Sequence, residues 1–241
     1  MSKTNISKSR YSISKMFDSI AQQYDVVNRV QTLGLDTVWR QKVAHYFPED
    51  RPLRVLDLAT GTADSLLMLL KLPQAQHVTR ALGVDIAEKM LEVGREKVQN
   101  SLFADKINLA LGDATQLEQK DSDFDVVTMM FGIRNVDNVD AALSEMYRVL
   151  DTKGRTIILE ISMPENPVIR AFYLFYFRYI LPNIAGLITG HKSAYDYLNR
   201  SSEQFIDPKS LCKKLKAAKF TNVQAIPIQF GMLTIYVGDK A

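Results

Sequence analysis

Acidic residues near the ends of three short hydrophobic runs form the most informative pattern in this chain. Asp57 lies near the end of the run over residues 53–59, Asp85 follows residues 77–84, and Asp113 follows residues 106–111. Gly61 comes shortly after Asp57, where a tight turn would lead into a helix. A carboxylate at such a strand end can accept the hydroxyls of a ribose. Taken alone, Asp85 or Asp113 is more readily explained as a helix N-cap, but the three acids together after a glycine turn favour a nucleoside site.

The nature of the nucleoside follows from what the turn after residues 53–59 lacks. A dinucleotide site would carry the pattern G-x-G-x-x-G, because a pyrophosphate needs backbone amides and a close approach to a helix N-terminus. Here the turn reads Ala59-Thr-Gly-Thr-Ala63. An acid followed by a single glycine suits a ligand that brings an amine and a sulfonium, and S-adenosylmethionine fits that description.

The alternation of strand-like and helix-like segments predicts the scaffold. Between residues 53 and 161, β-branched runs alternate with segments of helical period. A helix over residues 208–219 leads into two further strands, at 222–228 and 232–237, which would pair antiparallel. We therefore predict an α/β fold with a seven-stranded, mostly parallel sheet and helices on both faces. The ligand should lie beyond the carboxyl ends of the strands.

The segments outside this core predict a helical lid. Residues 14–24 and 37–47 read as two helices that could fold over the sheet edge, and Asn166 with Pro167 would start another that ends at Pro182. We expect a flexible tail over residues 1–15 and one domain over residues 16–241. The domain would comprise N-terminal helices (16–50), a cofactor-binding core (53–161), a substrate lid (164–205) and a C-terminal helix with strands (206–241).

Composition excludes several classes of function. The 241 residues carry 30 Lys+Arg and 27 Asp+Glu, so the basic excess that nucleic-acid binding usually requires is missing. One cysteine, Cys212, allows no intrachain disulfide and no CxxC motif, and three scattered histidines lack metal-ligand spacing. We expect no metal site. The first seventeen residues hold no apolar core of a secretory signal, and no stretch reads as a membrane-spanning helix.

Several motifs outside the first turn resemble one particular enzyme family. They are Met16-Phe-Asp-Ser-Ile-Ala-Gln-Gln-Tyr-Asp25 with Asn28, Trp39-Arg40, Phe131-Gly-Ile-Arg-Asn-Val136, Met146-Tyr-Arg-Val-Leu150 and Leu159-Glu160. Together with residues 55–64, they resemble the class I S-adenosylmethionine methyltransferases, and within these the C-methyltransferases of menaquinone and ubiquinone biosynthesis. The resemblance implies a Rossmann-like class I methyltransferase fold. Ala63 stands where this family usually has a second glycine, and Met130 where a small polar residue commonly precedes Phe-Gly.

The resemblance also implies a cofactor site and a reaction. S-adenosylmethionine would contact Thr62, Asp85, Asp113 and Ala114, with Gly61 shaping the turn. Asp57, from the strand-end pattern described above, is a further predicted cofactor residue. The implied reaction is C-methylation of a prenylated hydroquinone, with demethylmenaquinol as the first choice of acceptor. A 2-polyprenyl-6-methoxy-1,4-benzoquinol of ubiquinone synthesis stays open, as does a non-catalytic protein of the same fold that binds cofactor or quinone.

The chemistry of the acceptor singles out three candidate catalytic residues. A hydroquinone carbon becomes a good nucleophile when its hydroxyl loses a proton, which a phenol with a pKa near 10 resists at neutral pH. Arg134, just beyond the fourth strand, would stabilise the phenolate or orient a water, since an arginine is too basic to accept the proton. Asn135 could hold the same oxygen. The resembled family also carries tyrosines in the segment over residues 190–197, where Tyr195, preferred over Tyr197, is the third candidate. Pairing of Arg134 with a surface acid is the alternative.

The aromatic residues after Asn166 bear on location and partners. Phe172, Tyr173, Phe175, Tyr176, Phe177 and Tyr179 would give a helix that is apolar on all sides, which needs a second apolar neighbour besides the sheet. A prenyl tail, a membrane surface, a partner subunit of a homo-oligomer or burial under residues 10–47 would each serve. We expect a cytoplasmic protein, with peripheral contact at the inner face of the cytoplasmic membrane left open.

Overall fold

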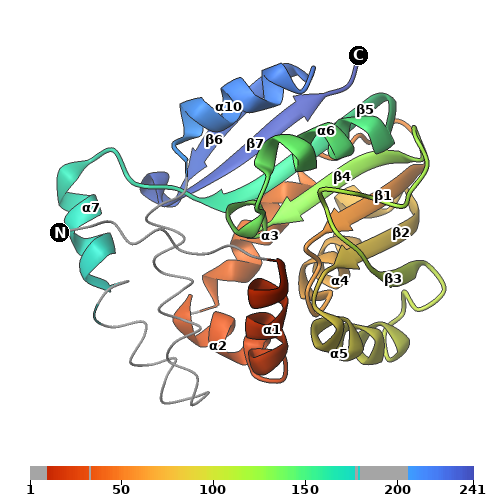
Figure 1. Ribbon diagram of the computed structural model, residues 1–241, viewed down its shortest axis with the longest axis horizontal. Coiled ribbons are helices and arrows are strands. Elements are labelled where there is room, and N and C mark those ends of the chain that lie inside the picture. The colour runs from red at the N-terminus through yellow and green to blue at the C-terminus, as the bar shows by residue number, and fades with distance from the viewer. Residues whose placement is uncertain (1–9, 33, 177–178, 180–205) are drawn as a thin grey trace.

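The computed structural model describes residues 10–32, 34–176, 179 and 206–241, and a seven-stranded sheet forms its centre (Figure 1). The strands are β1 (Leu53–Leu58), β2 (Val78–Asp85), β3 (Ile107–Leu111), β4 (Phe124–Met130), β5 (Leu150–Ile161), β6 (Thr221–Ile228) and β7 (Leu233–Asp239). Their order is β3-β2-β1-β4-β5-β7-β6. Strands β1 to β5 pair in parallel, whereas β7 runs antiparallel to both of its neighbours. The predicted mostly parallel sheet is confirmed.

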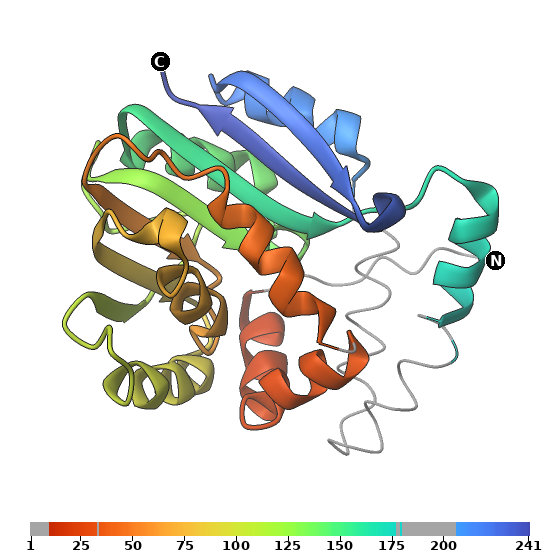
Figure 2. The ribbon, with the colours of Figure 1, turned by 180° about the vertical axis from the view of Figure 1, so that it is seen from behind.

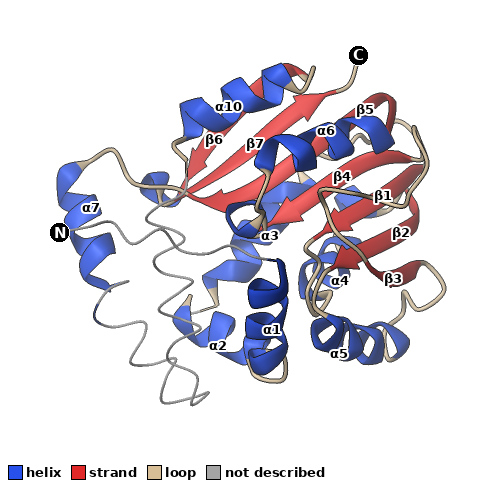
Figure 3. Cartoon of the chain, viewed as in Figure 1, coloured by secondary structure: helices blue, strands red, loops and turns tan. Residues whose placement is uncertain are grey.

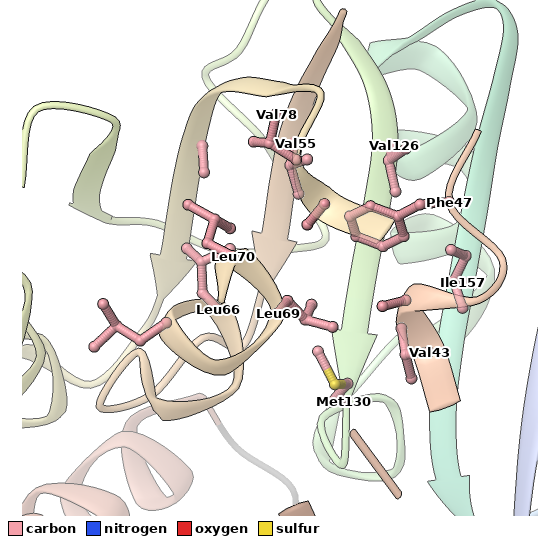
Figure 4. Close-up of a cluster of buried hydrophobic side chains, with 14 of the residues drawn as sticks. Val43, Phe47, Val55, Leu66, Leu69, Leu70, Val78, Val126, Met130 and Ile157 are labelled. Carbon is pink, nitrogen blue, oxygen red and sulfur yellow. The ribbon is translucent and has the colours of Figure 1, made fainter. Parts of the chain in front are cut away.

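Alternating side chains of the central strands build two hydrophobic cores, one on each face of the sheet. Val55 and Ile157 face one core, which α4 (Asp64–Leu70) and α3 (Leu35–Ala44) cover (Figure 4). Leu56 and Ile158, their neighbours in sequence, face the other core, which α6 (Val139–Val149) and α10 (Pro208–Ala217) cover. This period of two is expected for strands that are buried on both faces.

The helices lie on both faces of the sheet, as predicted (Figure 3). The chain passes from β1 through α4 to β2 and from β2 through α5 (Glu88–Gln99) to β3, and then returns to the other side of β1 to form β4. The strand order therefore reverses between β1 and β4. In open α/β sheets, ligands bind in the crevice outside the carboxyl ends of the strands at such a reversal.

The N-terminal segment forms three helices, whereas two were predicted. They are α1 (Arg10–Ile20), α2 (Tyr24–Gln31) and α3. The Thr32 hydroxyl closes α2 by donating to the carbonyl of Asn28 (2.7 Å), and it also contacts the Asp36 carboxylate at the start of α3 (3.0 Å). Helix α1 begins inside the expected tail because Ile13 is buried and the Ser14 hydroxyl donates to the carbonyl of Ile86 (3.0 Å). Figure 2 shows these helices gathered beside one face and edge of the sheet.

Helix α7 (Pro167–Phe175) stands apart from the sheet (Figure 1). Its predicted start is confirmed, since the Asn166 side chain accepts the N–H groups of Val168 and Ile169 and Pro167 is the first helical residue. Phe172 and Phe175 are exposed. Within the described ranges, no helix is long and apolar enough to cross a membrane.

Candidate active site

The turn between β1 and α4 is joined to the end of β2 by hydrogen bonds. Gly61 has a φ of +57°, a left-handed conformation that glycine adopts without the steric cost of a side chain. Its N–H donates to Oδ2 of Asp85 (2.8 Å), and the N–H of Ala87 donates to Oδ1 of the same carboxylate (2.9 Å). Burial raises the pKa of Asp85 to about 6, although these backbone donors oppose the rise. The carboxylate keeps lone pairs for further donors such as ribose hydroxyls.

The alternative interpretation of these acids as helix caps does not hold for Asp85 or Asp113. Helix α5 has Ala87 as its N-cap residue, with no side-chain cap bond. Asp113 accepts the N–H of Thr115 (2.8 Å) in a loop after β3 that leads into no helix. Both carboxylates are therefore placed at the carboxyl edge of the sheet without a capping role.

Asp57 lies behind the turn. Its side chain is 1% exposed, and Oδ1 accepts the Thr128 hydroxyl of the neighbouring strand β4 (2.6 Å). Burial raises the pKa of this carboxyl to about 6. The described residues that line the nearby cleft do not include Asp57, so the structure places it as a support of the turn from below.

A cleft opens at the carboxyl edge of the sheet, where the turn after β1 meets the loops after β2, β3 and β4 and helices α1 to α3. Five of the six predicted cofactor residues line it, namely Gly61, Thr62, Asp85, Asp113 and Ala114. The charged side chains among its described lining residues are five acids and one base, namely Asp25, Asp64, Asp85, Asp113, Asp137 and Arg40. This excess of acids favours a ligand that carries positive charge.

The N-terminal helices are tied to the turn by an ionic network that the sequence analysis did not predict. The Thr62 hydroxyl donates to Oδ1 of Asp25 on α2 (2.7 Å), and Lys97 Nζ on α5 donates to Oδ2 of the same carboxylate (2.8 Å). Arg40 on α3 pairs with Asp64, the first residue of α4. Asp25 and Arg40 belong to the motifs that carried the family resemblance, which was the only sequence signal for them.

Aromatic and apolar side chains of the same helices close the cleft on another side. Ile13 and Phe17 of α1 and Tyr24 of α2 line it. The rings of Phe17 and Tyr24 meet edge to face at a centroid distance of 6.0 Å. Burial raises the pKa of the Tyr24 phenol, so this group is neutral at physiological pH. The cleft therefore joins an acidic wall to an apolar one.

Arg134 pairs with a buried acid, and the predicted alternative of a surface acid is wrong. It lies in the short helix Ile133–Asn135 after β4 and is 5% exposed. Its Nη1 donates to Oε1 of Glu160 (2.7 Å) and to the carbonyl of Phe131 (2.6 Å), while its backbone N–H reaches Oε2 of Glu160 (3.2 Å). Glu160 is fully buried. Arg134 lies behind the cleft wall, which Phe131 and Asn135 form.

Asn135 is the candidate catalytic residue that reaches the cleft. It lines the cleft, and its side-chain Oδ1 is buried with no hydrogen-bond donor among the described residues. A buried carbonyl oxygen without a donor is costly, so it marks a place where a ligand hydroxyl would be stabilised. The third candidate, Tyr195, lies outside the described residues.

Comparison with known proteins identifies the family. The sequence profile of the ubiE/COQ5 methyltransferase family matches residues 3–240. The chain belongs to the ubiE/COQ5 methyltransferase family. It is 35% identical over 237 residues to the demethylmenaquinone methyltransferase of Bacteroides fragilis, covering 98% of this chain and 96% of the relative. It is 38% identical over 232 residues to the ubiquinone/menaquinone biosynthesis C-methyltransferase UbiE of Geotalea daltonii, covering 95% and 96%.

The fold agrees with this assignment. A crystal structure of an S-adenosylmethionine-dependent methyltransferase from Thermotoga maritima matches with a TM-score of 0.66 at 20% identity, covering 94% of this chain and 99% of the other. This member of the ubiE/COQ5 family is thus an S-adenosylmethionine-dependent methyltransferase with the class I fold. In the described part of the chain, no group of three or more His, Cys, Asp or Glu side chains is arranged to hold a metal ion.

The residues of the cleft fit this cofactor. Asp85 offers a carboxylate for ribose hydroxyls, and the acidic lining suits a ligand with a sulfonium and an ammonium group. Ala114 and Met90 offer apolar surface nearby. S-adenosylmethionine would therefore lie along the carboxyl ends of β1, β2 and β3, as the topology of the sheet requires.

Proposed function

We propose that this methyltransferase transfers a methyl group from S-adenosylmethionine to a ring carbon of a prenylated hydroquinone, with demethylmenaquinol as its acceptor. The observation that carries the proposal is the unsatisfied Oδ1 of Asn135 at the cleft wall, directly beside the buried Arg134–Glu160 pair. In this proposal, Oδ1 of Asn135 would accept a hydrogen bond from a hydroxyl of the acceptor at the edge of the cleft, with the Arg134 guanidinium fixed behind it. The names of the relatives from Bacteroides fragilis and Geotalea daltonii support the same substrate class.

The chemistry asks the protein mainly to position and to polarise the acceptor. When bound, S-adenosylmethionine supplies an electrophilic methyl carbon. In the reaction, an electron pair at a ring carbon of the hydroquinone would form the new C–C bond as the S–CH₃ bond breaks, S-adenosylhomocysteine would leave, and the ring proton would pass to water or another acceptor. Placing that ring carbon about 3 to 3.5 Å from the methyl carbon, in line with the breaking bond, supplies much of the rate enhancement.

Asn135 would orient the acceptor through its hydroxyl. A quinol hydroxyl that donates to Oδ1 fixes the ring at the cleft wall and draws electron density into the ring. The carboxamide cannot itself take the proton at neutral pH, so proton removal passes to water or to another acceptor. Tyr195 remains a predicted catalytic residue for this step.

Arg134 would act from behind this wall. Its bonds to Glu160 and to the Phe131 carbonyl hold the chain over residues 131–135, and its Nε has no hydrogen-bond partner among the described residues. The guanidinium thus fixes the backbone that carries Asn135 and contributes positive charge close to a developing phenolate. Arg134 is therefore a positioning residue in this proposal.

A methyl-transfer assay tests the proposal. The enzyme is incubated with methyl-labelled S-adenosylmethionine and either a short-chain demethylmenaquinol or a short-chain methoxybenzoquinol, each kept reduced, and the products are analysed by mass. We expect label on a ring carbon of the demethylmenaquinol and none with the oxidised quinone. Label on the benzoquinol alone would assign the chain to the ubiquinone branch. No label in either quinol, with S-adenosylhomocysteine bound normally, would refute the proposal.

A matched pair of variants tests the role of Asn135. Asn135→Ala removes the acceptor at the cleft wall, and we expect kcat with the quinol to fall on the order of 10- to 100-fold, with cofactor affinity retained. Asn100→Ala makes the same change at an exposed position after α5 and should leave both quantities unchanged. Equal activity of the two variants would show that Asn135 does not contact the acceptor.

The exposed aromatic face of α7 supports a proposal for location. Val168, Phe172 and Phe175 are more than half exposed, and an acceptor with a prenyl tail resides in a membrane. We propose peripheral contact of a cytoplasmic enzyme with the inner face of the cytoplasmic membrane. Cosedimentation with anionic vesicles should be lost when Phe172 and Phe175 are replaced by Ser.

A further inference from the structure

The sole basic side chain among the described residues that line the cleft is Arg40. It lies on α3 and is 5% exposed, although arginine is almost never buried unless it is paired. Five carboxylates line the same cleft. Any anionic group of a ligand that enters this cleft is repelled by those acids unless it meets Arg40.

The ion pairs of Arg40 leave one edge of its guanidinium without a hydrogen-bond acceptor among the described residues. Nη1 makes both ion pairs, a close one with Asp64 and a longer one with Asp36 (3.6 Å). Nε is buried and has no hydrogen-bond partner in the described part of the chain. Nε and Nη2 together form the planar edge that binds a carboxylate through two parallel hydrogen bonds. A buried N–H without an acceptor is costly, which indicates that an acceptor is supplied by a ligand.

The position of this edge is fixed by packing. Helix α3 lies against α4, and Val43 of α3 shares a core cluster with Leu66 and Leu69 of α4 (Figure 4). Asp64 opens α4 directly after the turn that carries Gly61 and Thr62. Arg40 is therefore held beside the cofactor turn, on the side away from Asp113 and the end of β3.

The neighbouring cations, Lys97 and Arg29, do not have an unused hydrogen-bond donor that faces the cleft. Lys97 Nζ already donates to Asp25 (2.8 Å), Thr62 (3.2 Å) and Asp64 (3.4 Å), which uses its three N–H groups. Arg29 pairs with Asp36 and Asp64, is 39% exposed and does not line the cleft. Among the described cations of this network, Arg40 alone combines burial, access to the cleft and an unused edge.

We propose that Arg40 binds the α-carboxylate of the methionine portion of S-adenosylmethionine through its Nε–Nη2 edge. Asp64 and Asp36 hold the guanidinium in place from Nη1 while the carboxylate takes the opposite edge. The adenosine portion then lies toward Asp85 and Asp113. The proposal concerns the cofactor alone and does not depend on which quinol is methylated.

Binding measurements with ligands that differ only at the methionine end test the proposal without any turnover. Isothermal titration calorimetry is run with S-adenosylhomocysteine, with its decarboxylated analogue and with 5′-methylthioadenosine, which lacks the whole amino-acid end. For Arg40→Gln we expect the affinity for S-adenosylhomocysteine to fall on the order of 10- to 100-fold. The affinities for the two ligands without a carboxylate should change less than about threefold. Arg40→Lys, which retains the charge but not the planar edge, should recover part of the loss.

Arg29→Gln is the matched control, because it removes a cation with the same two acidic partners outside the cleft. It should leave all three affinities within about threefold of the wild type. Arg40→Gln could fail to fold because Asp64 loses its partner. In that case the double variant Arg40→Gln/Asp64→Asn removes both charges of the pair, and its affinities for the three ligands are compared in the same way. An equal loss of affinity for all three ligands, or no loss for any, would overturn the proposal and reduce Arg40 to a support of the cleft wall.

Discussion

Asp57 gives a quantitative test of how the turn after β1 is supported. The carboxyl group is buried between β1 and β4, and its pKa rises from an ordinary value of 3.8 to about 6. A difference of about 2 pH units, at about 1.4 kcal/mol each, corresponds to about 3 kcal/mol. This is the cost of keeping the group ionised in the folded protein at neutral pH.

The sign of the effect follows from the direction of the shift. Well below pH 3.8 the carboxyl is protonated in both the folded and the unfolded chain, so no cost arises. As the pH rises from 4 to 6, the unfolded chain ionises first, and the folded state loses about 3 kcal/mol relative to it. Asp57→Asn removes this loss and keeps an oxygen that accepts the Thr128 hydroxyl. The variant should therefore be more stable than the wild type at pH 8, and the difference should shrink to a small fraction of this at pH 4.

Urea unfolding followed by circular dichroism measures this difference at both pH values. Asp125→Asn is the matched control of opposite sign, because hydrogen bonds from Arg54 hold the pKa of Asp125 below its usual range against the effect of burial. That variant should be less stable than the wild type at pH 8, with the difference shrinking toward acid. If Asp57→Asn is destabilised equally at pH 8 and pH 4, the carboxylate is not the strained group that the structure indicates.

Three further perturbations have directions fixed by the structure. Asp85 takes up a proton near pH 6, so the wild-type affinity for S-adenosylhomocysteine should fall as the pH drops from 7 to 5. Asp85→Asn should bind this ligand about tenfold more weakly at pH 7 and show no such pH dependence. Calorimetry at both pH values measures these affinities. Gly83→Ala would place its Cβ 2.6 Å from Leu109 Cδ2, so urea unfolding should report a loss of about 1–3 kcal/mol. Glu160→Gln leaves the Arg134 guanidinium buried without its counter-charge, and urea unfolding should show a loss of about 3 kcal/mol in stability. The double variant Glu160→Gln/Arg134→Met should regain most of this stability but should not regain methyl-transfer activity.

The features that the sequence predicted are those set by local periodicity. Runs of β-branched residues predicted the strands, and because parallel strands end at one edge, acids at or just after the ends of strands had to meet there, whereas Asp57 lies one residue before the end of β1 and is buried behind the turn. Asp85 and Asp113 accordingly face one cleft. The helix start at Asn166 was predictable for the same reason, since a cap and the helix it closes are neighbours in sequence.

The unpredicted features depend on pairs that only the tertiary fold brings together. Asp25 meets Lys97 across 72 positions, and Arg134 meets Glu160 across 26. No spacing rule identifies such partners, because the same charges could equally lie in water. The packing of α2 against the β1–α4 turn and of β5 beside β4 selects them. This is why the family motifs were recognisable in the sequence while the contacts that they make were not.

Ala63 shows how a departure from the family pattern can leave the site intact. Relative to the glycine that this family usually has, Ala63 adds a methyl group to the turn after β1. Its φ is +58°, a left-handed conformation that destabilises a residue with a side chain by about 1–2 kcal/mol. Ala63 is also fully buried in the core on the α4 face, and burial of its methyl group stabilises the fold by about 0.8 kcal/mol. The described lining of the cleft includes Thr62 and Asp64 but not Ala63, because the methyl group points into the core. Alanine at this position therefore has a small energetic cost within the core and adds nothing to the described lining of the cleft.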